Sequence, residues 1–350
     1  MHLPFLNSAT AINFTSVIFI LVTLIIFLDS VHGFSKKNVM IDSPLLTQKI
    51  GRNRTIIVDA NGEGDFKSVQ AAIDHVPNGN SKWIIIHIQK GVYREKVTVP
   101  RNKPYIFMRG SGRGKTSIVW SESSENNYDS AIFKVEAPHF VAFGIGFKNT
   151  APTGITYSGP SKSVAAFLGA DKVAFYKCAF FSNHNTLFDY KGSHYYDNCY
   201  IQGSIDLIFG HGQAMFHECE VFAVADGRIE IGGSIAANHR QSHNESSGFV
   251  FVNGKVYGVG NVHLGRAKGT HSRVIFANTY LSRTVIPQGW TKWSYQGRTD
   301  NLHHAEYKCH GPGSASKNRA HWSKQLGDEE AVPFLSIDFI KGKEWLPTWL

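Results

Sequence analysis

Three segments of the chain repeat one pattern: Phe175-Tyr176-Lys177-Cys178, Tyr196-Asp197-Asn198-Cys199 and Phe216-His217-Glu218-Cys219. Each reads aromatic-x-x-Cys, and the cysteines are 21 and 20 residues apart. A repeat of about 20 residues built from short β-prone runs is typical of a parallel β-helix. The runs at 143–147 and 274–280 predict further coils without a cysteine. Three hairpins of a β-sandwich, with cysteines that coincide by chance, are the alternative.

Equivalent residues of a parallel β-helix stack about 4.8 Å apart, so the three cysteines are expected to form a ladder. That spacing allows a disulfide between neighbours and equally allows free buried thiols. Counting seven residues on from the first two cysteines reaches Asn185 and Asp206, which are therefore expected to stack on adjacent coils. The third coil would place Asp226 there, unless an insertion changes the register. A zinc site is not expected, because the chain has no Cys-x-x-Cys pair.

The remaining sequence fits one folded domain over residues 55–350. Of its 350 residues, 42% are hydrophobic and 18% charged, and 33 Gly and 24 Phe against 4 Met indicate turns and strands more than helices. Short strands are expected at 56–58 and 83–88. A helix is expected between them, with Asp65 as its N-cap, running through His75 and ended by Pro77.

The N-terminus predicts export. The apolar run at 17–28 suits a secretory signal peptide, which we place at 1–33, followed by a short polar segment at 34–54. Because no Lys or Arg precedes the run, an uncleaved anchor is the alternative. Sequons at Asn53 and Asn244 fit a secreted glycoprotein.

The net charge of +9 indicates an acidic partner. The basic residues form no block, which argues against nucleic acid, and export favours an extracellular acidic polysaccharide. We expect a monomer that is not an integral membrane protein.

Three further motifs resemble, in order and spacing, the signatures of plant pectinesterases, also called pectin methylesterases. They are Gly91-Val92-Tyr93-Arg94-Glu95, Gly203-Ser204-Ile205-Asp206-Leu207-Ile208-Phe209-Gly210 and Leu264-Gly265-Arg266. The resemblance runs from 58–62 through 311–313 to 333–335. It implies an all-β fold, a right-handed single-stranded parallel β-helix of the pectin-lyase-like kind. It also implies a cell-wall enzyme without a cofactor, which hydrolyses methyl esters of homogalacturonan to carboxylate and methanol.

The resemblance also implies roles for individual residues. Asp206 matches the nucleophile that attacks the ester carbonyl, and Arg266 matches an arginine that holds this aspartate and contacts substrate. Four departures from the family pattern involve five other positions. His184-Asn185 stands where the family has a Gln-Asp pair, whose Gln stabilises the oxyanion and whose Asp donates the proton. Lys162 replaces another Gln. Lys268 replaces a substrate-stacking Trp, and Ile132 replaces a substrate-contacting Thr.

These departures predict weakened catalysis. Losing a general acid typically costs 10²- to 10⁴-fold in rate, and an amide at Asn185 cannot donate a proton to methoxide. His184 is either a substitute donor or a surface histidine without a role. Lys162 and Lys268 either favour de-esterified, anionic pectin or are solvated lysines without a role. We expect Asn185→Asp, together with His184→Gln, to raise the activity.

Two other functions compete with the esterase. A non-catalytic pectin-binding protein is favoured by Asn185 and opposed by the retained Asp206 and Arg266. A polygalacturonase or lyase is hinted at by Gly210-His211-Gly212, but the sequence offers too few clustered carboxylates. The aromatic residues Trp290, Trp293 and Tyr295 either stack on sugar rings or pack against the coil.

Overall fold

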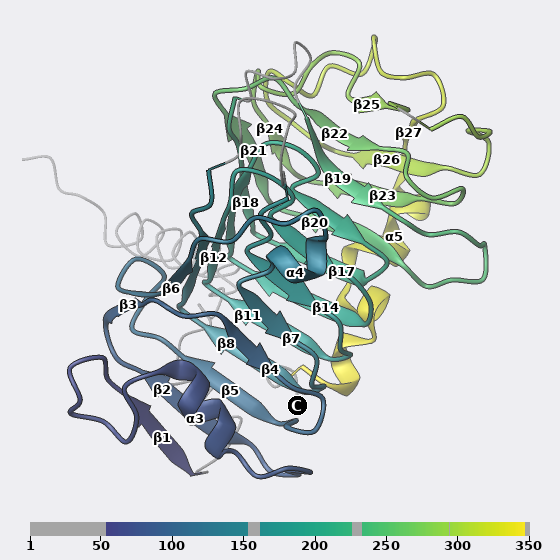
Figure 1. The fold of residues 1–350 in the computed structure, drawn as a ribbon. Coiled ribbons are helices and arrows are strands. Elements are labelled where there is room, and N and C mark those ends of the chain that lie inside the picture. The colour runs from purple at the N-terminus through teal and green to yellow at the C-terminus, as the bar shows by residue number, and fades with distance from the viewer. Residues whose placement is uncertain (1–53, 153–161, 226–232, 294, 347–350) are drawn as a thin grey trace, which may run out of the picture. The chain divides into compact units, whose positions relative to one another are not determined.

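From β2 to β25, each turn of the chain adds one strand to each of three parallel sheets, as Figure 1 shows. The computed structural model describes residues 54–152, 162–225, 233–293 and 295–346. The predicted signal peptide, the segment at 34–53, Asn53 and Asp226 lie outside these residues. None of the helices within them is both long enough and apolar enough to cross a membrane.

The sheets are named A, B and C in the order in which the chain first enters them. Sheet A contains, in order, β1 (Thr55–Val58), β2 (Ile84–Ile88), β5 (Ile106–Arg109), β8 (Phe140–Phe143), β11 (Val173–Tyr176), β14 (Ser193–Asp197), β17 (Gln213–His217), β20 (Gly248–Val252), β23 (Arg273–Ala277), β26 (His303–Tyr307) and β27 (Lys324–Gln325). Sheet B contains β3 (Gly91–Tyr93), β6 (Thr116–Trp120), β9 (Gly146–Asn149), β12 (Ala179–Phe181), β15 (Tyr200–Gly203), β18 (Glu220–Ala223), β21 (Lys255–Gly258) and β24 (Tyr280–Leu281). Sheet C contains β4 (Val97–Val99), β7 (Phe133–Val135), β10 (Ala166–Leu168), β13 (Leu187–Asp189), β16 (Ile208–Gly210), β19 (Ser234–Asn238), β22 (His263–Arg266) and β25 (Trp290–Thr291).

The strand pairs of these sheets are parallel, and the predicted β-helix is confirmed against the β-sandwich. The aromatic residues of the repeat are register partners: Phe175 pairs with Tyr196, and Tyr196 pairs with Phe216. Both rings stack on their neighbours, with centroids 5.5 Å and 4.5 Å apart. The stack continues through Phe251 and Phe276, at 4.6 Å and 4.3 Å. The interior therefore gains offset-stacked aromatic contacts as well as apolar burial.

One residue makes the bend from sheet A to sheet B in successive coils, and its φ angle is positive. The bend residues are Lys177, Asn198, Glu218, Asn253, Asn278 and Lys308, with φ of 50°, 50°, 51°, 57°, 49° and 46°. Three of them are asparagine, the residue besides glycine that tolerates this conformation best. In the aromatic-x-x-Cys repeat, the second x is therefore the bend residue.

The residue after each bend returns to the interior. Cys178, Cys199 and Cys219 occupy this position on successive coils, as predicted, and Cys309 occupies it on a later coil. All four are free thiols. Burial raises the pKa of the Cys178 and Cys219 thiols well above the ordinary value, which keeps them protonated and unreactive.

Helices cover the N-terminal coil. Helix α3 (Val69–His75) packs on β1, β2 and β4. Its N-cap is Ser68, whose hydroxyl accepts from the Ala71 N–H, so the prediction that Asp65 caps it was wrong. The Asp65 carboxylate instead accepts from the Ile57 N–H at 2.7 Å and closes the preceding loop.

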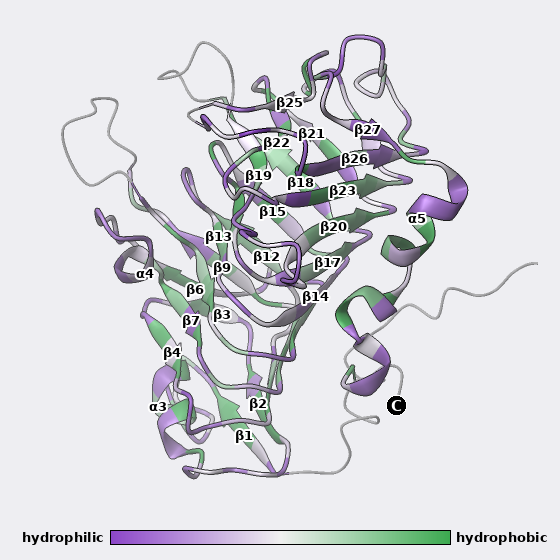
Figure 2. Cartoon of the chain, turned by 90° about the vertical axis from the view of Figure 1, so that its right-hand side faces the viewer, coloured by the Kyte–Doolittle hydropathy of each residue, from purple (hydrophilic) through white to green (hydrophobic). Residues whose placement is uncertain are grey.

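At the other end, α5 (Asp328–Leu335), η1 (Ile337–Ile340) and η2 (Gly342–Glu344) follow the last strands, and α5 and η1 pack on sheet A. Figure 2 shows hydrophobic colouring on β20 and β23 but hydrophilic colouring on β26. There Glu306 pairs with Phe276 and takes the next place in the aromatic stack. Its carboxylate binds Arg319 through two hydrogen bonds, of 2.7 Å and 2.9 Å.

Candidate active site

Asp206 lies on the bend from sheet B to sheet C, between β15 and β16. The backbone of His184 forms a parallel bridge with Ile205, and the Asn185 N–H donates to the Ile205 carbonyl at 3.1 Å. Asn185 and Asp206 are therefore register partners, as predicted, and both have positive φ, 56° and 45°. A left-handed backbone at both positions turns their side chains out of the regular strand alternation.

The third coil differs from the prediction. Ile208 pairs with Ala236, so the residue that follows Asp206 in the stack is Ser234, not Asp226. An insertion between β18 and β19 shifts the register, because the offset grows from 21 to 28 residues.

Arg266 and Ser234 hold the Asp206 carboxylate. The Arg266 guanidinium donates from Nε to Oδ1 at 2.7 Å and from a terminal nitrogen to Oδ2 at 2.5 Å. The Ser234 hydroxyl donates to Oδ1 at 2.7 Å. Asp206 is 7% exposed, so only a small part of this residue meets solvent. A two-point contact with arginine fixes the plane of the carboxylate.

The charge of Asp206 follows from two opposed effects. Burial alone would raise the pKa of Asp206, but the hydrogen bonds and charge of Arg266 outweigh it. Ser234 and Lys268 add to the lowering, so the pKa is below the ordinary value. The carboxylate is thus ionised and oriented, as a nucleophile must be.

Lys268 and Lys162 lie on the same side of the molecule as Asp206. Lys268 is exposed, and partial burial and the charges of Arg266 and Lys162 lower its pKa. Lys162 donates from Nζ to the backbone oxygen of Glu125 at 2.6 Å and lies 3.8 Å from the Glu125 carboxylate. The surroundings of Asp206 therefore carry more positive than negative charge.

Two histidines extend this group. The rings of His211 and His239 meet edge to face, with centroids 5.0 Å apart. Burial, and then the charges of His211, Lys268 and Arg266, lower the pKa of His239 to about 4. His239 is thus a neutral imidazole above about pH 4, within electrostatic reach of Asp206.

A packed aromatic cluster lies beyond Asp206 on sheet C, and its rings Phe167 and Phe209 are buried. Phe188 and Phe209 lie three residues beyond Asn185 and Asp206, and their rings stack at 4.5 Å. Phe167 packs against Phe188 at 5.2 Å. On the other side, Trp293 is 47% exposed, and the Arg266 guanidinium lies 5.0 Å from its ring centroid. Of these rings, Trp293 offers an exposed flat face beside a charged group, which suits the ring of a uronic sugar.

A family model described as pectinesterase matches residues 55–343. The chain is 57% identical to "Probable pectinesterase 67" of Arabidopsis thaliana, over 96% of this chain and 98% of that protein. The chain belongs to the pectinesterase family. Its fold matches a pectin methylesterase from carrot with a TM-score of 0.80 at 28% identity, over 85% of this chain and 96% of that one. A pectin methylesterase solved with a hexasaccharide, 21% identical, has the same fold, with a TM-score of 0.73 over 85% of this chain and 99% of that one.

Within this pectinesterase fold, the structure brings most of the predicted site residues together. Asp206, Arg266, Lys268 and Asn185 cluster around one bend, and His184 is half-buried on the neighbouring coil.

Ile132 does not belong to the predicted site. The prediction that it contacts substrate was wrong, because it is fully buried in the interior core. Trp290 is also fully buried and stacks on His304 at 4.9 Å, so it packs against the coil.

Two residues of the candidate site were not predicted from the sequence: Ser234 and His239. Ser234 and His239 lie beyond the insertion, where counting from the cysteines fails.

Proposed function

We propose that the chain is a pectin methylesterase, which hydrolyses methyl esters of homogalacturonan with Asp206 as nucleophile. The observation that carries the proposal is the ionised Asp206 carboxylate, held by Arg266 and Ser234, with the exposed ring of Trp293 against Arg266. Neither a metal nor an organic cofactor is needed for this chemistry.

The reaction follows from the position of the carboxylate. An Asp206 oxygen bonds to the ester carbon, and the carbonyl π pair moves to the oxygen. Collapse breaks the bond to methoxide, which takes a proton, and leaves an acyl-aspartate. Water then adds to the acyl carbon, the bond to Asp206 breaks, and a galacturonate carboxylate, a proton and methanol are the products.

The protonation step is the weak point of this site. Asn185 has no acidic proton, so water or His184 must supply the one that methoxide takes. We therefore propose a slow esterase. Pectin binding without catalysis is the second candidate, and the absence of a carboxylic acid at Asn185 is the observation that favours it.

The positive charge near Asp206 bears on the degree of methyl esterification of the pectin that binds. Lys268 and Lys162 add positive charge beside the nucleophile, so we propose that partly de-esterified pectin binds better than fully methylated pectin. Because pectin is a wall polymer, we also propose that the chain is exported, with cleavage near Gly33, and acts outside the cell.

Methanol release from highly methylated pectin by the purified protein tests the activity. Asp206→Asn should lower the rate about 10³-fold or more, because the nucleophile is lost. Asp300→Asn removes an exposed carboxylate paired with Arg298 and should leave the rate unchanged. Wild-type release no faster than that of Asp206→Asn would reject the esterase and leave the binding protein.

A further inference from the structure

Asn185 is bonded to a residue from a distant part of the chain. Its Nδ2 donates to Oδ1 of Asn127 at 2.8 Å, across 58 residues of sequence. Asn127 is the first residue of α4 (Asn127–Ser130), which lies in the connection between β6 and β7. No motif or repeat in the sequence connects these two residues.

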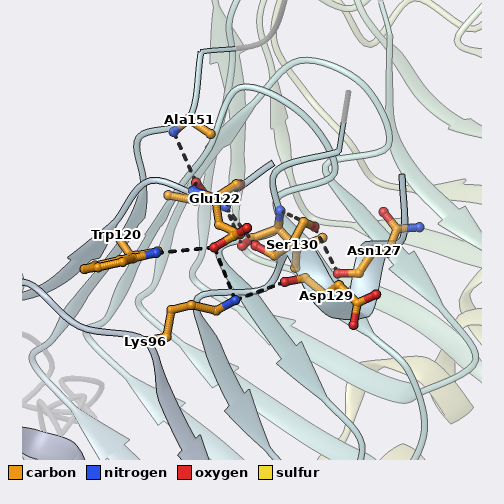
Figure 3. Close-up of polar contacts among 9 residues, drawn as sticks. Lys96, Trp120, Glu122, Asn127, Asp129, Ser130 and Ala151 are labelled. Atoms are coloured by element: carbon orange, nitrogen blue, oxygen red, sulfur yellow. Dashed lines mark hydrogen bonds and ion pairs between the residues drawn. The ribbon is translucent and has the colours of Figure 1, made fainter. Parts of the chain in front are cut away.

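Helix α4 is anchored at several points, which Figure 3 shows. The Ser130 hydroxyl donates to the Asn127 carbonyl at 3.0 Å, and the Asn149 amide donates to the Ser130 carbonyl at 3.0 Å. The Lys96 ammonium donates to the Asp129 carbonyl at 3.2 Å and lies 3.4 Å from the Glu122 carboxylate. These contacts tie α4 to two neighbouring segments and fix the backbone that carries Asn127.

The backbone of Asn185 is fixed too. Its N–H is bonded to Ile205, and its φ of 56° is one that the bend imposes. A carboxamide has two N–H donors and one acceptor oxygen. The contact with Asn127 takes one N–H, and among the described residues no other hydrogen bond to the Asn185 side chain is present. The second N–H and the oxygen are therefore left for a ligand at Asp206.

We infer that Asn127 is a positioning residue, which holds the Asn185 carboxamide so that its second N–H donates to the oxygen of the tetrahedral intermediate. This inference rests on the proposed esterase. Asn185 then stabilises the charge that forms when Asp206 attacks, and water supplies the proton to methoxide. Donors fixed in advance at such an oxygen are worth about 10²- to 10³-fold in rate, and losing only their orientation costs less.

The contact with Asn127 would also affect an acid introduced at position 185. In Asn185→Asp, the new carboxylate faces Asn127, whose amide can turn and donate from Nδ2. A hydrogen bond to the charged form lowers the pKa of a carboxyl group, so the new group would hold its proton poorly. The full gain in rate should appear only when Asn127 is replaced as well.

Four proteins test this coupling: the wild type, Asn127→Leu, Asn185→Asp and the double variant. We expect Asn127→Leu to lower kcat about 10-fold with KM within twofold, since it removes the acceptor and keeps the size. Asn185→Asp alone should change kcat less than about threefold. The double variant should exceed Asn185→Asp by about 10-fold, and its rate should fall on the alkaline side as the new acid loses its proton.

Control variants distinguish a loss of folding from a loss of the Asn127–Asn185 contact. Asn301→Ala, an exposed asparagine, should behave as the wild type. If Asn127→Leu does not fold, as thermal unfolding would show, Asn127→Ser replaces it throughout. Equal effects of the Asn127 change in both backgrounds, or an effect on KM alone, would overturn the inference. Methanol release at the level of Asp206→Asn in the wild type would instead reject the proposed function.

Discussion

The ion pair between Asp206 and Arg266 sets the pH range of the site. The pKa of Asp206 lies below its ordinary value because Arg266 outweighs burial. The carboxylate therefore contributes stability above its unfolded-state pKa, and this contribution is lost as pH falls through the folded-state pKa. Activity should accordingly persist below the usual carboxyl range.

Replacing Arg266 should reverse this balance. In Arg266→Gln, burial of Asp206 is no longer offset, so the pKa of Asp206 should rise and the acidic limb of kcat/KM should move to higher pH. The rate should also fall about 10²-fold, because the carboxylate loses its two-point support. Arg298→Gln, at an exposed pair, is the control. An acidic limb that stays in place in Arg266→Gln would contradict the assignment.

Counting along the repeat predicts stacked residues only where coil lengths are equal, whereas Arg266 was identified from the family motif. Asn185 and Asp206 share one offset because the two loops before them have matching lengths, so counting was sufficient. Ser234 was out of reach, since the following coil is longer. Ile132 was misplaced because an alignment fixes a position in the chain but not whether its side chain faces the core or the surface.

At the scale of elements, the motif Gly91-Val92-Tyr93-Arg94-Glu95 supports a helix. The Glu95 carboxylate accepts from the Val69 N–H at 2.7 Å and the Gln70 N–H at 2.9 Å, at the start of α3. The Tyr93 hydroxyl donates to the Val58 carbonyl at 3.2 Å. A motif recognised through the family thus closes the N-terminal coil and takes no part in the site.

Glu95→Ala should destabilise this end of the molecule. Two helix N–H groups lose a charged acceptor, which typically costs about 1–2 kcal/mol. Denaturant unfolding of Glu95→Ala against Glu63→Ala, an exposed glutamate of the preceding loop, measures the difference. Equal stability of the two variants would show that α3 does not depend on this cap.

The last coil carries a buried ion pair where earlier coils carry a ring. The side chains of Arg319 and Glu306 are 4% and 1% exposed. Arg319→Met should cost about 3–5 kcal/mol in unfolding free energy, because Glu306 stays buried without its partner. Adding Glu306→Phe, which continues the aromatic stack, should recover much of the loss. A double variant no more stable than Arg319→Met would argue against this account.

For the whole molecule, the sequence predicted the architecture because a β-helix repeats. One coil resembles the next, so the aligned cysteines favoured the solenoid over a β-sandwich, and the family resemblance implied the same fold. The ends of the β-helix do not repeat. The repeat therefore could not predict the Ser68 cap of α3 or the ion pair of Arg319 with Glu306 in the last coil.

The net charge of +9 predicts how the whole molecule binds an acidic polymer. Binding to pectin should weaken as salt rises, because exposed charges act over only about 8 Å at physiological ionic strength. It should strengthen as the polymer loses methyl esters and gains carboxylates. Lys162→Gln with Lys268→Gln should lower the affinity for de-esterified pectin about 3- to 10-fold at low salt and reduce the salt dependence.

The matched control is Lys67→Gln with Lys317→Gln, since both lysines are exposed and belong to the first and last parts of the described chain. It removes the same net charge away from Asp206. If affinity depends on total charge alone, the two double variants will lose it equally. If Lys162 and Lys268 contact the polymer, only their variant will lose the preference for de-esterified over fully methylated pectin. Affinity that is unchanged by salt, or highest for fully methylated pectin, would show that the positive charge around Asp206 does not recognise the polymer.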